Sequence, residues 1–302
     1  GRRQWMLNDA TSNLLGAEVS DSRLNGARFC SIKTNSAENV KKGLEFQEFM
    51  MNILLTNDDG IHAEGLWALF YRLRERHTVT VIAPDRERSA IGHAITLHEP
   101  LRANLVTVNG GYSGYAVSGT PADCVKLGLF ELLGARPDMV VSGINPGANV
   151  GININYSGTV AAAKEAAVYG VSAIAVSMDG FTSNHYDDAA LFVRRLTEKV
   201  FNGKLPAGTF LNVNIPDVAL KTMAGVRPSR QGLPESLDFF DKRIDPRNRA
   251  YYWQGCETQR FDASPDVDGT ALAEKYISIT PIKCDMTDYR VLDQMRDWKI
   301  GI

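Results

Sequence analysis

The amino-acid sequence predicts an α/β fold: a doubly wound, mostly parallel, Rossmann-like sheet with an appended C-terminal β-hairpin and helix. Short apolar runs without polar alternation, of which 52–56 is the first, indicate strands that are covered on both faces. Segments with helical spacing separate these runs, and strand–helix–strand repeats form parallel sheets. After about Arg227 the chain becomes polar and aromatic, ending in the run 251–255, which favours a hairpin suited to contacts between subunits.

The predicted strands follow one another in a regular order. Before residue 226 they are the runs 52–56, 79–83, 115–118, 139–142, 174–177 and 210–215. Pro84 ends the second strand, because proline cannot donate to a sheet's hydrogen-bond ladder. The later segment 276–282 alternates as a further strand does.

Helices are predicted between these strands. Apolar residues recur at helical spacing from Leu66, and Thr120 is a suitable N-cap for a helix with Pro121 at its first position. The remaining helices are expected at 157–169, at 187–200 with Asp187 as the cap, and at 291–298.

Three regions are expected along the chain. Residues 1–50 mix polar and charged residues without a sustained period, so we expect a poorly ordered extension. Residues 51–225 form the Rossmann-like catalytic core, and residues 226–302 form a hairpin and tail for oligomerisation that complete the domain.

Composition excludes several classes of protein. The 302 residues are 44% hydrophobic and 23% charged, which is ordinary for a globular protein. A formal net charge of -2 gives no support for nucleic-acid binding, and the sequence has no apolar run long enough for a membrane span. The four cysteines are scattered, as expected of reduced thiols in a cytoplasmic protein.

Two adjacent carboxylates, Asp58 and Asp59, follow the first predicted strand. Like-charge repulsion makes such a pair costly unless a cation offsets it. Asn57 and Gly60 on either side are also favoured turn residues, so a solvated turn is the alternative interpretation. Because parallel sheets bind ligands at the carboxyl ends of their strands, the position favours a functional pair.

Neutral oxygen ligands follow two other strands. Ser89 lies in the loop after the second strand, and Asn145 lies after the run 139–142. Together with Asp58 and Asp59 they form an all-oxygen set, which suits Mg²⁺ or Mn²⁺ and not zinc. Each loop alone is compatible with simple turn chemistry, but three at one sheet edge favour a metal site.

The start of the alanine-rich helix is a candidate phosphate site. Ser157, Gly158 and Thr159 would present hydroxyls and free N–H groups to an anion. An ordinary N-cap is the alternative. His62 and His93 lie near enough in the predicted fold to touch a substrate. The sequence has no P-loop, serine-hydrolase elbow or dinucleotide fingerprint, which rules out a P-loop NTPase, counts against a serine-triad hydrolase and disfavours dinucleotide binding.

Several motifs in order resemble the stationary-phase survival protein SurE family. They are Met51-Asn-Ile-Leu-Leu-Thr-Asn-Asp-Asp-Gly-Ile, Ala83-Pro-Asp-Arg, Ser118-Gly-Thr-Pro-Ala-Asp-Cys-Val, Pro137-Asp-Met-Val-Val-Ser-Gly-Ile-Asn and Tyr156-Ser-Gly-Thr-Val-Ala-Ala-Ala. The resemblance runs from Met51 to about Trp298 and leaves residues 1–50 without a counterpart. Asn153 departs from the pattern, since many members carry Asp before the Tyr-Ser-Gly-Thr motif.

The resemblance implies a cytoplasmic 5'-nucleotidase, a phosphoric monoester hydrolase. Such enzymes remove phosphate from nucleoside 5'-monophosphates, often from 3'-monophosphates, and some shorten polyphosphate. It implies one divalent metal cation per subunit, held by the matching Asp58, Asp59, Ser89 and Asn145. It also implies a homodimer or homotetramer in which subunits exchange the C-terminal hairpin and tail.

The expected mechanism leaves one choice open. Asn57, Gly143, Ser157 and Thr159 would cradle the phosphate oxygens while the cation neutralises charge. Either water attacks in line with Asp58 as base, which we favour, or Asp58 attacks and forms a phosphoaspartate. A non-catalytic nucleotide-binding module and an interaction protein that uses the aromatic hairpin are the rival functions.

Overall fold

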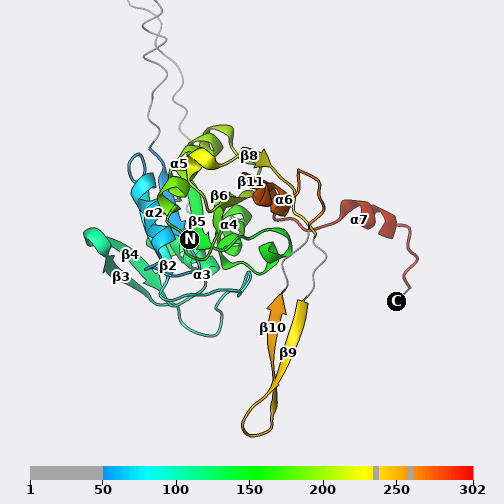
Figure 1. The fold of residues 1–302 in the computed structure, drawn as a ribbon. Helices are drawn as coiled ribbons and strands as arrows, with labels where there is room; N and C mark the ends of the chain where they lie inside the picture. The colour runs from blue at the N-terminus through cyan, green and yellow to red at the C-terminus, as the bar shows by residue number, and fades with distance from the viewer. Residues whose placement is uncertain (1–49, 234–237, 257–260, 302) are drawn as a thin grey trace, which may run out of the picture. The chain divides into compact units, whose positions relative to one another are not determined.

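A computed structural model describes residues 50–233, 238–256 and 261–301 (Figure 1). The prediction that residues 1–50 form a poorly ordered extension therefore concerns residues outside the described part of the chain, except for Met50. The strands are β1 (Asn52–Thr56), β2 (Thr78–Pro84), β3 (Ala103–Val108), β4 (Tyr112–Val117), β5 (Met139–Pro146), β6 (Ser172–Asp179), β7 (Thr209–Pro216), β8 (Gly225–Pro228), β9 (Asp238–Ile244), β10 (Ala250–Cys256) and β11 (Tyr276–Lys283). The α-helices are α2 (Glu64–Leu73), α3 (Pro121–Leu127), α4 (Gly158–Val168), α5 (Tyr186–Gly203), α6 (Asp268–Ala273) and α7 (Tyr289–Met295).

The central sheet confirms the predicted doubly wound α/β class. In the described part of the chain, its strand order is β3-β4-β2-β1-β5-β6-β7-β11-β8. The inner strands β2, β1, β5, β6 and β7 run parallel, whereas β3 pairs antiparallel with β4 and β11 antiparallel with β7. The chain order reverses between β1 and β5, so the strand ends that carry Asp58 and Asn145 lie next to each other.

Helices cover both faces of this sheet because alternate residues of each strand point to opposite sides. Ile53 and Leu55 of β1 belong to one hydrophobic cluster, which includes the apolar face of α2, whereas Leu54 belongs to a second cluster with α4. Burying one such side chain contributes roughly 1.5–3 kcal/mol. The small alanines of α4 let this helix approach the sheet closely, which brings its first turn to the end of β1.

Most predicted elements are confirmed, including the helix that begins after Thr120. The Thr120 hydroxyl accepts a hydrogen bond from the backbone N–H of Asp123, and the Asp123 carboxylate accepts one from the backbone N–H of Thr120. This reciprocal arrangement is a capping box. The prediction that Asp187 caps α5 is wrong, because the helix begins at Tyr186 and His185 is the N-cap. The Asp187 carboxylate instead accepts hydrogen bonds from Arg72. Strand β3 was not predicted, because its outward-facing residues are largely exposed and the apolar signal is weak.

The C-terminal region contributes to two sheets. Strands β8 and β11 complete the central sheet, so the expected boundary at 225/226 falls inside β8. Strands β9 and β10 form the predicted hairpin as a separate two-stranded sheet (Figure 1). Within the described residues, no helix is both long and apolar enough to cross a membrane.

Candidate active site

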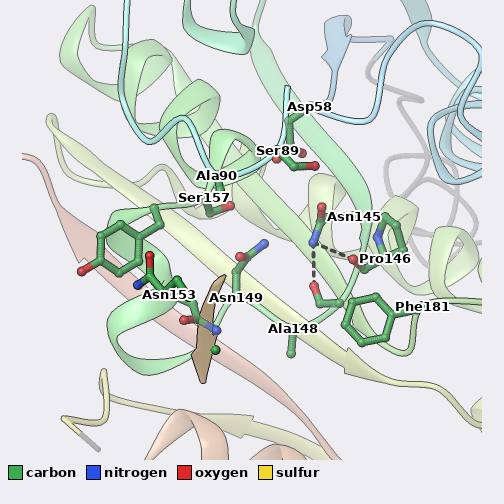
Figure 2. Close-up of a pocket in the computed structure, with 14 residues that line it drawn as sticks. Asp58, Ser89, Ala90, Asn145, Pro146, Ala148, Asn149, Asn153, Ser157 and Phe181 are labelled. Atoms are coloured by element: carbon green, nitrogen blue, oxygen red, sulfur yellow. Dashed lines mark hydrogen bonds between the residues drawn. The ribbon is translucent and has the colours of Figure 1, made fainter. Parts of the chain in front are cut away.

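A cavity of about 690 Å³ opens where the ends of β1 and β5 meet the start of α4 (Figure 2). Asp58 follows β1, Asn145 lies on β5, and Ser157 is the N-cap of α4. The loop after β2 contributes Ser89 to the same wall. The cavity therefore lies at the carboxyl ends of the strands, where parallel sheets bind their ligands.

Asp58 is almost fully buried and is held by the first turn of α4. The hydroxyl of Thr159 donates a hydrogen bond to Asp58 Oδ1. Burial raises the pKa of Asp58, while hydrogen bonds from Thr159 and from the backbone of Gly158 oppose the rise. Gly158 permits this approach, since a Cβ there would lie 2.8 Å from the Asp58 Cβ. The helix N-terminus thus stabilises the carboxylate through its free N–H groups.

The carboxylate of Asp59 lies near other negative charges without a compensating partner among the described residues. Its Oδ2 atom is buried and has no hydrogen-bond partner among the described residues. Burial raises its pKa to about 7, and the negative charges of Asp58 and Glu87 add to the rise. Asp59 itself is not among the residues that line the cavity with Asp58. Such a crowded acidic pair is the arrangement that a cation relieves.

Ser89 lies exposed on the loop after β2, and its hydroxyl has a defined orientation. Ser89 Oγ donates to Glu87 Oε1 at 2.6 Å, which leaves its lone pairs available to a ligand. The loop is attached to the end of β1, because the backbone N–H of Arg88 donates to the carbonyl of Asp58 at 2.7 Å.

The side-chain amide of Asn145 is oriented by backbone carbonyls. Its Nδ2 donates to the carbonyls of Pro146 at 3.2 Å and Gly147 at 2.6 Å. Because carbonyls only accept, these bonds assign the nitrogen and leave Oδ1 directed towards the part of the cavity that holds Asp58 and Ser89 (Figure 2). The result is a neutral oxygen donor opposite the carboxylate.

These donors fit a hard divalent cation. Asp58, Ser89 and Asn145 line one cavity, and the unpartnered oxygen of Asp59 belongs to the adjacent residue. Carboxylate, hydroxyl and amide oxygens suit Mg²⁺ or Mn²⁺. Across the described ranges, no group of three or more His, Cys, Asp or Glu residues is placed to hold a metal, as a zinc site would require.

The five residues predicted to bind phosphate occupy different positions. Ser157 lines the cavity, and its hydroxyl accepts from the backbone of Val160 at 3.2 Å. Gly158 and Thr159 face Asp58, as described above. The side chain of Asn57 closes the turn, bonding both the carbonyl and the N–H of Gly60. Gly143 is buried within β5, where a Cβ would lie 2.3 Å from the Val176 carbonyl oxygen.

The remaining candidates and several unpredicted residues complete the surroundings. His62 lines a separate cavity of about 400 Å³, and His93 pairs with Glu165. Tyr156 and Phe181 line the main cavity with exposed rings, 59% and 86% accessible. Phe181 follows β6, so the strand-end rule applied to that strand would have found it. Other unpredicted lining residues are Ala90, Pro146, Gly147, Ala148, Asn149, Gln254 and Gly255.

Asn149 holds the loop after β5 on the neighbouring strands. Its backbone N–H donates to Asn214 Oδ1 at 2.8 Å, and its carbonyl accepts from Asn212 Nδ2 at 2.8 Å. Its own side-chain amide donates to Ser177 at 2.8 Å. All four polar residues are buried, so the network ties the loop that follows Asn145 and the end of β5 to β6 and β7.

The chain matches the family model described as survival protein SurE over residues 53–236. It belongs to the SurE family. The 5'-nucleotidase SurE of Desulfatibacillum aliphaticivorans is 58% identical over 250 residues, which are 83% of this chain and 99% of that protein. The 5'-nucleotidase SurE of Syntrophobacter fumaroxidans is 48% identical, covering 83% of this chain and all of that protein.

A SurE structure also has this fold. The crystal structure of the SurE protein from Aquifex aeolicus is similar with a TM-score of 0.73 and 37% identity, covering 81% of this chain and 98% of that chain. The family and the fold class that the motifs indicated are therefore confirmed. The family match starts at residue 53, within β1, two residues after the start of the predicted core.

Proposed function

We propose that this SurE-family chain is a metal-dependent phosphomonoesterase that hydrolyses nucleoside 5'-monophosphates to nucleoside and phosphate. The supporting observation is the cavity lined by Asp58, Ser89 and Asn145, with a buried, unpartnered carboxylate oxygen on Asp59, the next residue along the chain. Relatives that are 45–58% identical are named 5'-nucleotidase SurE. We extend the proposal to 3'-monophosphates and to shortening of polyphosphate, as the family resemblance implies.

One Mg²⁺ or Mn²⁺ per subunit would be held by Asp58, Asp59, Ser89 and Asn145. When bound, the cation supplies charge neutralisation for the transferring phosphoryl group. Ser157, the N-cap of α4, lies on the cavity wall, where it would help to orient the phosphate. Phosphoryl transfer depends mainly on such positioning and on electrostatic stabilisation.

Water attack with Asp58 as base is favoured over a phosphoaspartate. Asp58 accepts a hydrogen bond from Thr159 and further ones from the α4 backbone. These bonds occupy and orient the carboxylate oxygens, which leaves them less free to move into line with phosphorus. Burial raises the pKa of Asp58, which favours proton acceptance from a water. Rapid-quench assays with labelled substrate check this choice: a hydroxylamine-sensitive phosphoenzyme would establish Asp58 as the nucleophile.

A nucleotide is favoured over other phosphate esters by the cavity's size and lining. Its volume of about 690 Å³ lies in the range of small-molecule pockets, roughly 300–1,000 Å³. The exposed faces of Tyr156 and Phe181 on its wall are surfaces on which a base can stack.

The direct test is an assay of the full chain against a panel of nucleoside monophosphates, with glycerol phosphate as a comparison ester. We expect activity with Mn²⁺ or Mg²⁺ that is abolished by chelator and reduced at least 10³-fold in Asp58→Asn, about 4 kcal/mol of transition-state stabilisation. Full activity with chelator would refute the metal assignment. Binding of nucleotides without turnover would instead support the rival of a non-catalytic nucleotide-binding module.

A homodimer or homotetramer is proposed for the assembly. The hairpin of β9 and β10 exposes large side chains on both faces, including Phe240 at 65%, Tyr252 at 58% and Trp253 at 61%. A two-stranded sheet is marginally stable alone, so a second copy of the chain is the proposed cover. Light scattering after size exclusion checks it, with a monomer as the contrary outcome. A cytoplasmic location remains an expectation from the family resemblance.

A further inference from the structure

The loop that carries Ser89 has no helix or strand between the end of β2 at Pro84 and the start of β3 at Ala103. It also buries little apolar surface, since Ile95 is 41% and Leu97 is 74% exposed. Hydrophobic packing therefore contributes little to holding the loop around Ser89, and specific polar contacts are needed there.

Those polar contacts lie on both sides of Ser89. Before it, the Arg88 N–H donates to the carbonyl of Asp58 at 2.7 Å. After it, the Gly92 N–H donates to the carbonyl of Tyr156 at 2.9 Å. The next residue, His93, has its Nε2 atom 2.6 Å from Glu165 Oε2.

Glu165 is a nearly buried carboxylate on α4, with 9% of its side chain exposed. Burial works against its charge, but the hydrogen bond from His93 and the nearby charges of His93 and Lys126 outweigh burial and lower its pKa. Lys126 Nζ lies 3.5 Å from the other carboxylate oxygen. Glu165 is thus a charged anchor inside the fold, and His93 is its contact from the loop.

Helix α4 consequently contacts one proposed cation ligand and the loop that carries another. Its first turn bonds Asp58 through Thr159, and Glu165, about 9 Å further along the axis, bonds the loop of Ser89 through His93. A helix is rigid over this length, so it can set the spacing between the two loops. His93 does not line the main cavity, which separates its role from contact with substrate.

We propose that His93 and Glu165 are a pair of positioning residues that fix the Ser89 loop on α4 and so set Ser89 at the distance from Asp58 that cation binding needs. The proposal rests on the proposed metal-dependent function. The pair acts through Ser89, as the residues that orient metal ligands do in other proteins.

Four variants of the full chain test the pair. His93→Ala removes the contact, whereas His93→Gln keeps a nitrogen near the position of Nε2. Glu165→Gln keeps the shape of the anchor without its charge. His98→Ala is the matched control, because His98 is an exposed histidine of the same loop.

Mn²⁺ binding is measured by calorimetry without substrate. We expect His93→Ala to bind Mn²⁺ about 10–100-fold more weakly, as is typical when a residue behind a metal ligand is lost. His93→Gln should recover most of the affinity, Glu165→Gln should be intermediate, and His98→Ala should match the wild type. In His93→Ala, kcat should recover at saturating Mn²⁺ while KM for the nucleotide changes little.

Hydrogen exchange of the metal-free protein supplies a readout that is independent of cation and substrate. Backbone amides at 90–95 should exchange faster in His93→Ala, with β1 and β5 unchanged. Wild-type Mn²⁺ affinity and unchanged exchange in His93→Ala would overturn the proposal, as would a His93→Gln variant as defective as His93→Ala. If the wild type neither binds Mn²⁺ nor hydrolyses nucleotides, the proposed function fails, and the exchange experiment still decides whether the pair holds the loop.

Discussion

The hydroxyl of Thr159 donates a hydrogen bond to the carboxylate of Asp58, so the first turn of α4 holds the end of β1. This contact joins residues 101 positions apart in the chain. It accounts for how a nearly buried carboxylate is kept in one orientation next to a second acidic residue.

Thr159→Val tests this contact with little change in shape. The hydroxyl donates a hydrogen bond that lowers the pKa of Asp58. Its loss should therefore raise the pKa of Asp58 further. We expect Mn²⁺ affinity to fall about 10–100-fold and the acid limb of the pH–rate profile to move to higher pH. Thr159→Ser keeps the hydroxyl and should behave as the wild type; an unchanged pH profile in Thr159→Val would contradict the role.

Gly158→Ala should separate activity from stability. The added Cβ would lie 2.8 Å from the Asp58 Cβ and 2.9 Å from its Oδ2, so the carboxylate must move. Alanine restricts the unfolded chain more than glycine does, a gain of about 0.4–1 kcal/mol that offsets part of the strain. We expect a loss of at least tenfold in kcat/KM with a melting temperature within a few degrees of the wild type. Gly203→Ala on α5, where a Cβ meets nothing within 4 Å, is the matched control.

The acidic pair predicts a pH dependence of stability in metal-free protein. Burial, with the charges of Asp58 and Glu87, raises the pKa of Asp59 from 3.8 to about 7. Between these values the folded protein keeps a proton that the unfolded chain has released, so the contribution of Asp59 to stability is lost as pH rises towards 7. With chelator, the melting temperature should fall from pH 5 to pH 8 more in the wild type than in Asp59→Asn.

Cation binding should show the reverse dependence on pH. A cation must displace the Asp59 proton, so affinity for Mn²⁺ should fall up to about tenfold per pH unit below 7 and level off above it. Calorimetric titrations at several pH values measure this. An affinity that is constant from pH 5.5 to pH 8 would count against Asp59 as a ligand.

Phe181→Ala tests the nucleotide preference. Stacking of a base on an aromatic ring contributes roughly 1–3 kcal/mol, so KM for nucleoside monophosphates should rise about 5–150-fold. KM for glycerol phosphate, which has no base, should stay the same. Phe181→Tyr keeps an aromatic face and should retain nucleotide affinity, whereas an equal rise for both esters would show that the ring only shapes the loop.

Local sequence patterns were sufficient for the fold class and for bringing several residues of the candidate site to one sheet edge. Apolar runs specify β1 and β5, because strands covered on both faces have no polar alternation. The strand-end rule then brought Asp58, Ser89 and Asn145 to one edge. It did not distinguish a residue that lines the cavity from one that closes a turn, so the turn role of Asn57 emerged only in three dimensions.

The sequence by itself determined which residues follow which strands, and therefore the acidic and neutral oxygens available at the sheet edge. Only the tertiary structure decided that Thr159 bonds Asp58, that His93 bonds Glu165, and that Asp187 bonds Arg72 instead of capping its helix. The physical reason is range: periodicity and capping depend on neighbours within a few positions, whereas these contacts join residues 72 to 115 positions apart. Such contacts depend on how the helices pack on the sheet, which no local pattern encodes.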